Sequence, residues 1–417
     1  MTVALALIDG DHHPEAVRHA LAGLSERMDL QGVLFCGGEE KLAPDVLSDP
    51  ERHYGRAVTL ATDRAEALRT LAPGADVVID LADEPVLDAG AKLELACVAL
   101  DLGLRYVGAD FELCPPELHA VPFDGPTVAV IGTGKRTGKT AVGVHWAVLL
   151  REHGHEPVVV AMGRGGPEHP TVAAAGTGLE ALLALSREGG HAASDYLEHA
   201  ALAGVPSVGC RRVGGGLAGA CVESNVPAGA QLAASLEPGM ILFEGSGAAL
   251  PPVEVDRTVC VIGSREGALD HLGPYRLQRA DLAVMTADDP GLAEAAARWC
   301  RGPVIPVTLE PEAVEPLEPG ARVAFFTTGA GLPAALDPIV VSRNLARRPA
   351  LAEDLRRAGA ERCDVYLTEL KAAAVDTVAE AADRAGARLV FVRNRPRERP
   401  GEPGLDAALL ELVEASS

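Results

Sequence analysis

The amino-acid sequence predicts an α/β protein built on parallel sheets. Short apolar runs alternate with stretches of helical length along most of the chain, which is typical of parallel strands covered by helices. Hydrophobic residues make up 48% of the chain and charged residues 23%, as in folded proteins. Because 417 residues exceed one ordinary domain, we expect two or three domains.

Residues 1–122 are predicted to form a Rossmann-like parallel-sheet domain. Two aspartates and two histidines in the segment 9–13 follow its first strand, at the edge where parallel sheets bind ligands. No G-x-G-x-x-G accompanies them, so a dinucleotide site is not predicted, and solvated loop histidines are the alternative. Lys41 and Lys92 are interpreted as ordinary surface lysines. The predicted strands are 3–8, 32–35, 57–60 and 75–80, with helices at 14–24 and 63–71.

A second domain, predicted over 123–310, opens with a strand at 127–131, a glycine-rich loop and a helix. The loop ends in Gly138-Lys139-Thr140. Backbone N–H groups of such loops face phosphate oxygens, the lysine reaches the β- and γ-phosphates, and the hydroxyl ligates Mg²⁺. The strict spacing requires glycine at 133, where this chain has threonine. The context still predicts a P-loop NTPase domain, with nucleotide-binding residues Gly132, Thr133, Gly134, Thr137, Gly138, Lys139 and Thr140.

Such a domain also needs a carboxylate for Mg²⁺ at the end of a neighbouring strand. The apolar run 239–243 is followed directly by Glu244, so we predict that Thr140 and Glu244 bind the metal. Asp256 is a candidate second carboxylate. The alternative for Glu244 is a structural role as a helix cap or loop carboxylate.

Basic residues gather in glycine-rich loops rather than along one helix. An arginine flanked by glycines can place its guanidinium on a phosphate beside backbone N–H groups. The net charge of −22 argues against nucleic acid or an anionic membrane as partner, so a small polyanion needs a locally positive pocket. Pairing with surface carboxylates is the alternative. The candidate anion-binding residues are Lys135, Arg136, Arg164, Arg211 and Arg212.

Residues 311–417 are predicted to form a C-terminal α/β extension, with a mobile tail at 393–404. His191 and Asp195 share one face of a predicted helix, and Glu369 and Lys371 follow a predicted strand. The first pair is either a substrate contact or a helix-capping arrangement. The second pair is either a substrate contact or a helix start exposed to solvent. The predicted strands are 322–327, 338–341, 364–367 and 388–392.

Targeting signals are not predicted. No apolar stretch reaches the ~18–20 residues of a membrane span, and the N-terminus lacks the basic start of a signal peptide. The eight cysteines form no C-x-x-C pair, which favours reduced thiols and a cytoplasmic protein.

Six segments, in this order, resemble the cyclic 2,3-diphosphoglycerate synthetase family. The phosphate loop and the Glu-Gly-x-Gly segment are more distantly similar to dethiobiotin synthetase, whose loop has the same displaced glycine. The likeness covers about two-thirds of the chain and extends more loosely over 1–122. The segments are 131–140, 160–167, 191–196, 209–216, 244–252 and 367–376.

The resemblance implies that ATP and 2,3-diphosphoglycerate give ADP, phosphate and the cyclic anhydride. It implies ATP and Mg²⁺ as cofactors, with a monovalent cation such as K⁺ as a further candidate, and a homodimer. Lys139, Lys135, Arg136 and Arg211 are the implied catalytic residues. The implied substrate-binding residues are Arg164, His191, Asp195, Arg211, Arg212, Glu369 and Lys371.

Two other functions stay open at this point. One is an ATP-dependent kinase or ligase that acts on another small polyanionic or carboxylate substrate. The other is a protein that hydrolyses ATP only to change shape and bind a partner. The arginine-rich loops favour an enzyme.

Overall fold

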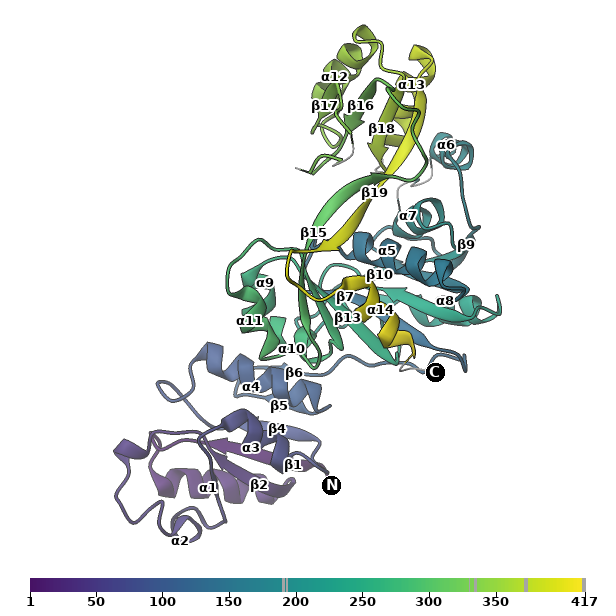
Figure 1. Cartoon of the computed structure of the whole chain (residues 1–417). Helices are drawn as coiled ribbons and strands as arrows, with labels where there is room; N and C mark the ends of the chain where they lie inside the picture. Colours follow the sequence, from purple (N-terminus) through teal and green to yellow (C-terminus); the bar gives the residue numbers. More distant parts are fainter. Residues whose placement is uncertain (190–191, 193, 330, 334–335, 371–373, 415–417) are drawn as a thin grey trace. The chain divides into compact units, whose positions relative to one another are not determined.

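A computed structural model describes the chain from 1 to 417, except residues 190–191, 193, 330, 334–335, 371–373 and 415–417 (Figure 1). The chain divides into two compact units. The first unit comprises Met1–Glu117, Leu217–Ala220 and Arg265–Arg279. The second unit comprises Leu118–Gly216, Cys221–Ser264 and Ala280–Ser417.

The first unit is built on a sheet in the order β3-β2-β1-β4-β5-β6, parallel except for β6. The chain moves outward from β1 to one side and then returns to start the other side at β4, as in Rossmann-like folds. The predicted parallel-sheet class is therefore confirmed. Its elements are β1 (Val3–Ile8), α1 (Pro14–Ser25), β2 (Asp29–Phe35), the 3₁₀ turn η1 (Glu39–Lys41), α2 (Pro50–Tyr54), β3 (Thr59–Leu60), α3 (Arg64–Leu71), β4 (Val77–Asp80), α4 (Ala89–Asp101), β5 (Arg105–Val107), β6 (Glu112–Leu113), α9 (Arg265–Leu269) and α10 (Gly273–Gln278).

Local sequence explains where these helices begin. His13 accepts a hydrogen bond from the N–H of Glu15, and Pro14 occupies the first turn of α1. Asp63 and Asp88 cap α3 and α4 in the same way. Such caps satisfy backbone donors that have no partner within the helix.

In the described residues, the strands of the second unit form one sheet of 13 strands. Its central order is β10-β8-β12-β7-β13-β14-β15, and these neighbours are parallel. Its strands are β7 (Thr127–Gly132), β8 (Pro157–Gly163), β9 (Thr171–Ala173), β10 (Ser207–Val213), β11 (Glu223–Ser224), β12 (Met240–Glu244), β13 (Arg257–Ile262), β14 (Leu282–Met285), β15 (Val304–Ala313), β16 (Val323–Phe326), β17 (Val340–Ser342), β18 (Val365–Glu369) and β19 (Arg388–Glu398).

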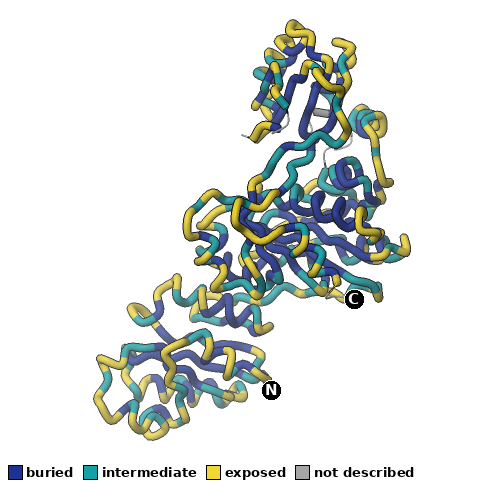
Figure 2. Tube along the Cα trace, in the orientation of Figure 1, coloured by how far each residue is buried: buried dark blue, intermediate teal, exposed yellow. Residues whose placement is uncertain are grey.

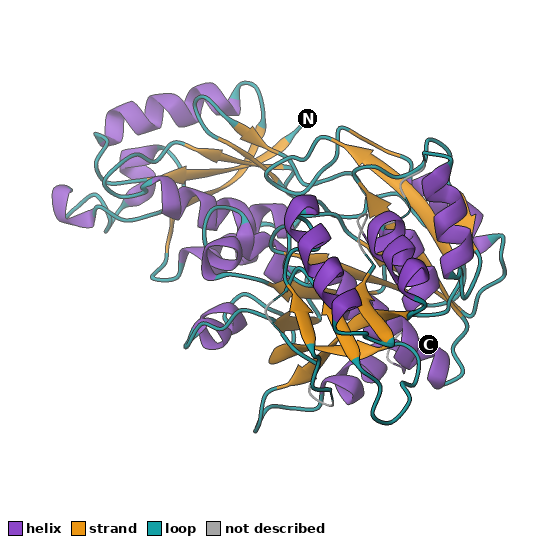
Figure 3. Ribbon diagram, turned by 90° about the horizontal axis from the view of Figure 1, so that it is seen from above, coloured by secondary structure: helices purple, strands orange, loops and turns teal. Residues whose placement is uncertain are grey.

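Helices cover the strands of this sheet (Figure 3). All six residues of β7 are buried, and the strands form the dark core of the tube (Figure 2). Trp146 of α5 is wholly buried in this core, which explains why the sequence of α5 is apolar almost all round. The helices are α5 (Lys139–Glu152), α6 (Leu179–Arg187), α7 (Asp195–Leu202), α8 (Val226–Ala234), α11 (Leu292–Ala297), α12 (Arg348–Ala360), η2 (Ala374–Val378, a π-helical turn), α13 (Ala379–Ala385) and α14 (Leu405–Glu414).

The segment 393–404, which the sequence predicts to be a mobile tail, forms a paired strand in its first half. Residues up to Glu398 belong to β19, which pairs antiparallel with β15 along the chain from Val307 to Ala313 (Figure 1). The paired stretch carries several charged residues, and ion pairs join the two strands, between Arg397 and Glu310 at 2.7 Å and between Arg393 and Glu312 at 3.1 Å. Residue 310, our predicted domain boundary, lies inside β15.

Beyond this ribbon, β17, β16, β18 and β19 run parallel to one another. Phe326 and Tyr366 pack within their core at a ring-centroid distance of 5.4 Å. Among the described residues, no helix combines the length and apolar character needed to cross a membrane. All eight cysteines are described, and all are free thiols.

Candidate nucleotide and anion site

The loop between β7 and α5 is shaped by two glycines. At Gly132 an added Cβ would lie 2.8 Å from Thr137 Oγ1 and 2.9 Å from Lys139 Cδ, so a side chain does not fit. Gly138 caps α5 with a φ of +94°, in the left-handed region that favours glycine.

Position 133 has no such requirement. Thr133 is buried, and its N–H donates to the carbonyl of Val261 on β13 at 3.1 Å. The close approach of the backbone therefore occurs at Gly132, which accounts for the displaced glycine in the sequence.

Lys139 folds back over the loop that precedes it. Its side chain is buried, and Nζ donates to the carbonyl of Gly134 at 2.8 Å. Burial lowers the pKa of Lys139, and the nearby carboxylate of Glu244 only partly opposes this. The ammonium therefore lies at the loop, where a phosphate group would replace one carbonyl contact.

Glu244, the last residue of β12, is buried and makes two short contacts, one to half-buried Thr140 and one to buried His199. Its Oε1 accepts from the hydroxyl of Thr140 at 2.7 Å, and its Oε2 lies 2.6 Å from Nε2 of His199. Burial alone would raise the pKa of Glu244, but His199 and then Thr140 outweigh it and the pKa is lowered. Burial alone would lower the pKa of His199, but Glu244 raises it overall.

A cavity of about 460 Å³ lies against this set. It opens at the carboxyl ends of β8, β12 and β7, which are neighbours in the sheet, the edge where parallel sheets bind ligands. The residues that line it are Lys135, Arg136, Lys139, Thr140, Gly163, Arg164, Gly165, Gly166, Ser194, Asp195, Glu244, Gly245, Ser246 and Gly247.

Three cations at this cavity have no partner among the residues that the structure describes. Lys135, Arg136 and Arg164 are exposed, and none makes a hydrogen bond or an ion pair with any residue that the structure describes. Positive charge of this density without carboxylate partners is costly unless an anion arrives. The cavity is therefore suited to bind a polyanion.

Arg212 lies behind the residues that line the cavity and holds one of them, Ser246, from inside the protein. It is buried, and its guanidinium donates to the carbonyls of Gly214 at 2.5 Å and Ser246 at 2.8 Å. Burial, and then the charge of Arg164, lower the pKa of Arg212. An added Cβ on Gly247 would lie 3.0 Å from Arg164 and 3.5 Å from Arg212, so both guanidinium groups lie beside this glycine.

Other predicted site residues lie elsewhere. Arg211 is exposed and does not line the cavity, because adjacent side chains of β10 point to opposite faces. Glu369 is buried, and its carboxylate accepts from the N–H and hydroxyl of Thr328 at 2.8 and 2.7 Å. His191 and Lys371 lie outside the described residues.

The roles of Asp256 and His199 differ most from what the sequence analysis predicted. Asp256 accepts from the N–H and hydroxyl of Thr127, both at 2.8 Å, at the end of β7 remote from the loop. His199, which sequence reasoning missed, holds Glu244. One signal was present, since His199 follows Asp195 by four residues and so shares its helix face.

The loop, the strand–helix context and the Thr140–Glu244 pair together define a P-loop nucleotide-binding protein. Three family models match the chain, and they describe the N-terminal domain (residues 3–114), the P-loop domain (residues 127–297) and the C-terminal domain (residues 335–395) of cyclic 2,3-diphosphoglycerate synthetase. The chain belongs to the cyclic 2,3-diphosphoglycerate synthetase family.

Full-length relatives support the same assignment. The chain is 43% identical to a cyclic 2,3-diphosphoglycerate synthetase of Rubrobacter xylanophilus, over 99% of this chain and 97% of that relative. It is 35% identical to a cyclic 2,3-diphosphoglycerate synthetase of Methanothermobacter thermautotrophicus, over 98% of this chain and 96% of that relative. The chain also aligns with a solved structure of LpxK from Aquifex aeolicus in complex with ATP. The alignment covers 72% of this chain and 90% of the LpxK chain, at 13% identity and a TM-score of 0.40.

Proposed function

We propose that this protein uses ATP to close 2,3-diphosphoglycerate into its cyclic anhydride, releasing ADP and phosphate. The observation that carries the proposal is the cavity of about 460 Å³ in which the phosphate loop meets cations that have no partner in the described part of the chain. Lys139 and the loop N–H groups suffice for the triphosphate of ATP. Lys135, Arg136 and Arg164 remain for a second anion.

The proposed chemistry has two displacements. An oxygen of one substrate phosphate attacks the γ-phosphorus of ATP, and ADP leaves. An oxygen of the other substrate phosphate then attacks the phosphorus that carries the transferred group, inorganic phosphate leaves, and the new P–O–P bond closes the ring. Phosphate oxygens are the nucleophiles, so no side chain has to remove a proton.

The side chains serve to hold charges together. Two phosphates on adjacent carbons repel each other, and phosphoryl transfer depends on positioning and electrostatic stabilisation. In the proposal Arg164, Arg212 and Asp195 orient the substrate at the cavity, while Arg211, His191, Glu369 and Lys371 stay predicted substrate contacts.

Mg²⁺ fits the same site. The Thr140 hydroxyl and the Glu244 carboxylate are oxygen donors 2.7 Å apart beside the cavity, and such donors suit Mg²⁺. Thr140 and Glu244 would hold the metal, which supplies charge neutralisation for the phosphates. We also propose a K⁺ requirement, a homodimer and a cytoplasmic location. The cytoplasm is proposed because it contains ATP and keeps cysteine thiols reduced.

Phosphorus NMR tests the proposed reaction. The protein is incubated with Mg-ATP and 2,3-diphosphoglycerate, and we expect ADP, inorganic phosphate and the cyclic product in equal amounts. Transfer of phosphate to another polyanion or carboxylate, with 2,3-diphosphoglycerate untouched, would favour the kinase or ligase. ATP hydrolysis at the same rate with and without any acceptor substrate would favour the protein that uses ATP only to change shape and bind a partner.

A further inference from the structure

His199 is a completely buried histidine that touches the proposed metal ligand. It lies on α7, has no exposed surface, and its Nε2 is 2.6 Å from Oε2 of Glu244. The other oxygen of Glu244 accepts from Thr140 at 2.7 Å. The three side chains therefore form one chain of contacts that ends at the phosphate loop.

The packing around His199 leaves room for its ring. Gly143 of α5 faces the imidazole, and an added Cβ there would lie 3.0 Å from Cε1 and 3.5 Å from Nε2 of His199. A glycine inside a helix lowers its stability. Its presence at this contact allows α5 to approach the ring closely.

The imidazole is also incompletely satisfied. Its Nδ1 is buried and has no hydrogen-bond partner among the described residues. An apolar side chain would remove this unpaired nitrogen, but it would leave Oε2 of Glu244 without its partner. The contact that distinguishes histidine from such a side chain is the one to Glu244.

We propose that His199 is a positioning residue that orients the Glu244 carboxylate for Mg²⁺. By holding Oε2, it keeps Oε1 beside the Thr140 hydroxyl. It also keeps the carboxylate from turning to Lys139, whose ammonium is close enough for their charges to interact and is needed at the phosphates. This inference rests on the proposed function only through Mg-ATP, not through the second substrate.

Calorimetric titration with ATP, in Mg²⁺ and separately in EDTA, tests this role without turnover. In His199→Leu we expect the Mg²⁺-dependent gain in ATP affinity to fall about tenfold, as when other partners of metal ligands are removed. Affinity for ATP in EDTA should stay unchanged. His199→Gln, whose amide N–H can occupy the place of Nε2, should retain most of the gain.

His145→Leu is the matched control. His145 of α5 makes a contact of the same length, 2.6 Å, to Asp406, and it too is buried, but its partner Asp406 does not line the cavity, whereas Glu244 does. This variant should lose thermal stability and keep the full effect of Mg²⁺. If His199→Leu behaves in the same way, His199 is only structural. The same conclusion follows if its affinity for ATP falls by the same factor in Mg²⁺ and in EDTA.

Gly143→Ala tests the proposal where His199→Leu fails to fold. Alanine is a better helix former than glycine, but its Cβ would press on the ring. We expect a smaller loss of the Mg²⁺ effect in the same direction, and an unchanged Mg²⁺ effect would overturn the proposal. A native protein that binds no Mg-ATP would instead reject the proposed function.

Discussion

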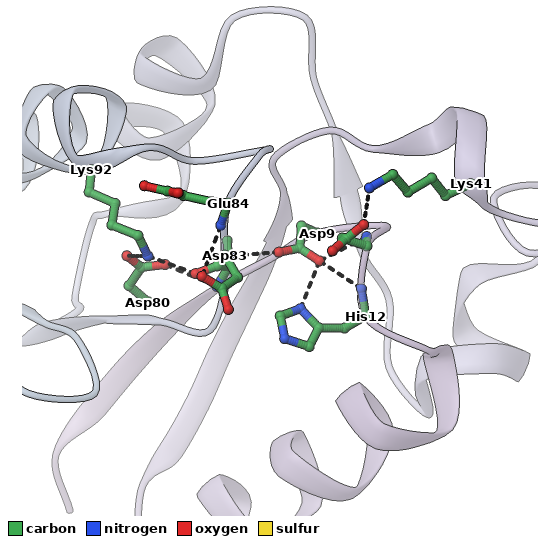
Figure 4. A network of polar contacts seen from close by, with 9 residues as sticks. Asp9, His12, Lys41, Asp80, Asp83, Glu84 and Lys92 are labelled. Atoms are coloured by element: carbon green, nitrogen blue, oxygen red, sulfur yellow. Dashed lines mark hydrogen bonds and ion pairs between the residues drawn. The ribbon is translucent and has the colours of Figure 1, made fainter.

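The two parallel sheets of this protein both carry charged residues at their carboxyl edges, yet they use them differently. In the first unit, carboxylates and cations are paired with each other (Figure 4). In the second unit, Lys135, Arg136 and Arg164 are left without a described protein partner around a cavity. Position at a sheet edge is therefore a weaker guide to a binding site than unsatisfied charge.

The first unit shows how its edge is closed. The buried carboxylate of Asp9 accepts from the N–H groups of Asp11 and His12 with one oxygen and from the N–H of Asp83 with the other, at 2.6 Å (Figure 4). This last bond ties the loop after β1 to the loop after β4. Burial opposes ionisation of Asp9, but these donors outweigh it and its pKa is lowered.

Lys92 belongs to the same closed edge, so its interpretation as an ordinary surface lysine is wrong. Its ammonium lies 2.7 Å from the buried carboxylate of Asp80, and the hydroxyl of Tyr106 donates to the same oxygen at 3.0 Å. Lys41 is more exposed and pairs with Asp11. These contacts join loops and strands, and they pair both lysines with carboxylates.

Lys139→Ala is the variant with the largest expected effect, and it tests whether the second unit holds the catalytic site. Turnover should fall by roughly a thousandfold or more, because the loop loses the charge that neutralises the transferred phosphate. The melting temperature should not fall, since a buried ammonium of lowered pKa is costly to hold. ADP release and thermal melting measure the two effects, and retained turnover would remove the loop from the site.

Arg164→Ala tests the unpartnered cations. Loss of one charged hydrogen bond should raise the KM for the polyanion about 10- to 100-fold and leave the affinity for ATP and the stability unchanged. Arg211→Ala is its matched partner, because Arg211 is also exposed but does not line the cavity. Equal loss in both variants would support the predicted catalytic role of Arg211.

Lys92→Met examines the paired edge of the first unit. It leaves the Asp80 carboxylate buried without its cation, so we expect a loss of about 2 kcal/mol in the free energy of unfolding. Urea denaturation measures the loss, and the double variant Lys92→Met with Asp80→Asn should recover part of it. Loss of turnover at unchanged stability would break the comparison, because the first unit would then hold a functional cation.

Acid titration of Asp406 is expected to have the smallest effect. Its hydrogen bond from His145 lowers the pKa of Asp406, although partial burial opposes this. Because the folded-state pKa is the lower one, the contribution to stability is present above the unfolded pKa of about 3.9. It is lost as the pH falls through the folded value.

Stability curves of the native chain and of Asp406→Asn measure this contribution. They should differ by about 0.5 kcal/mol at neutral pH, since the carboxylate is partly exposed. The two curves should converge in acid. A difference that grows as the pH falls would contradict the assignment.

Strong local signals account for what was predicted correctly. The apolar strands, the glycine-containing loop and the helix after it depend on neighbours in sequence, so β7, α5 and the cavity residues Lys139 and Thr140 were found. β15 and the second half of β19 were not recognised, because this stretch is rich in charged residues and its strands pair residues far apart in the chain.

The sequence by itself determined the α/β class, the phosphate loop and Glu244 at the end of a strand, because each is encoded within a few neighbouring residues. Only the tertiary structure decided which charges stay free. Arg211 and Arg212 are adjacent, yet one is exposed and the other buried beneath the cavity wall. His199 and Glu244 meet across 45 positions of the chain, and no local pattern specifies a contact that packing alone creates.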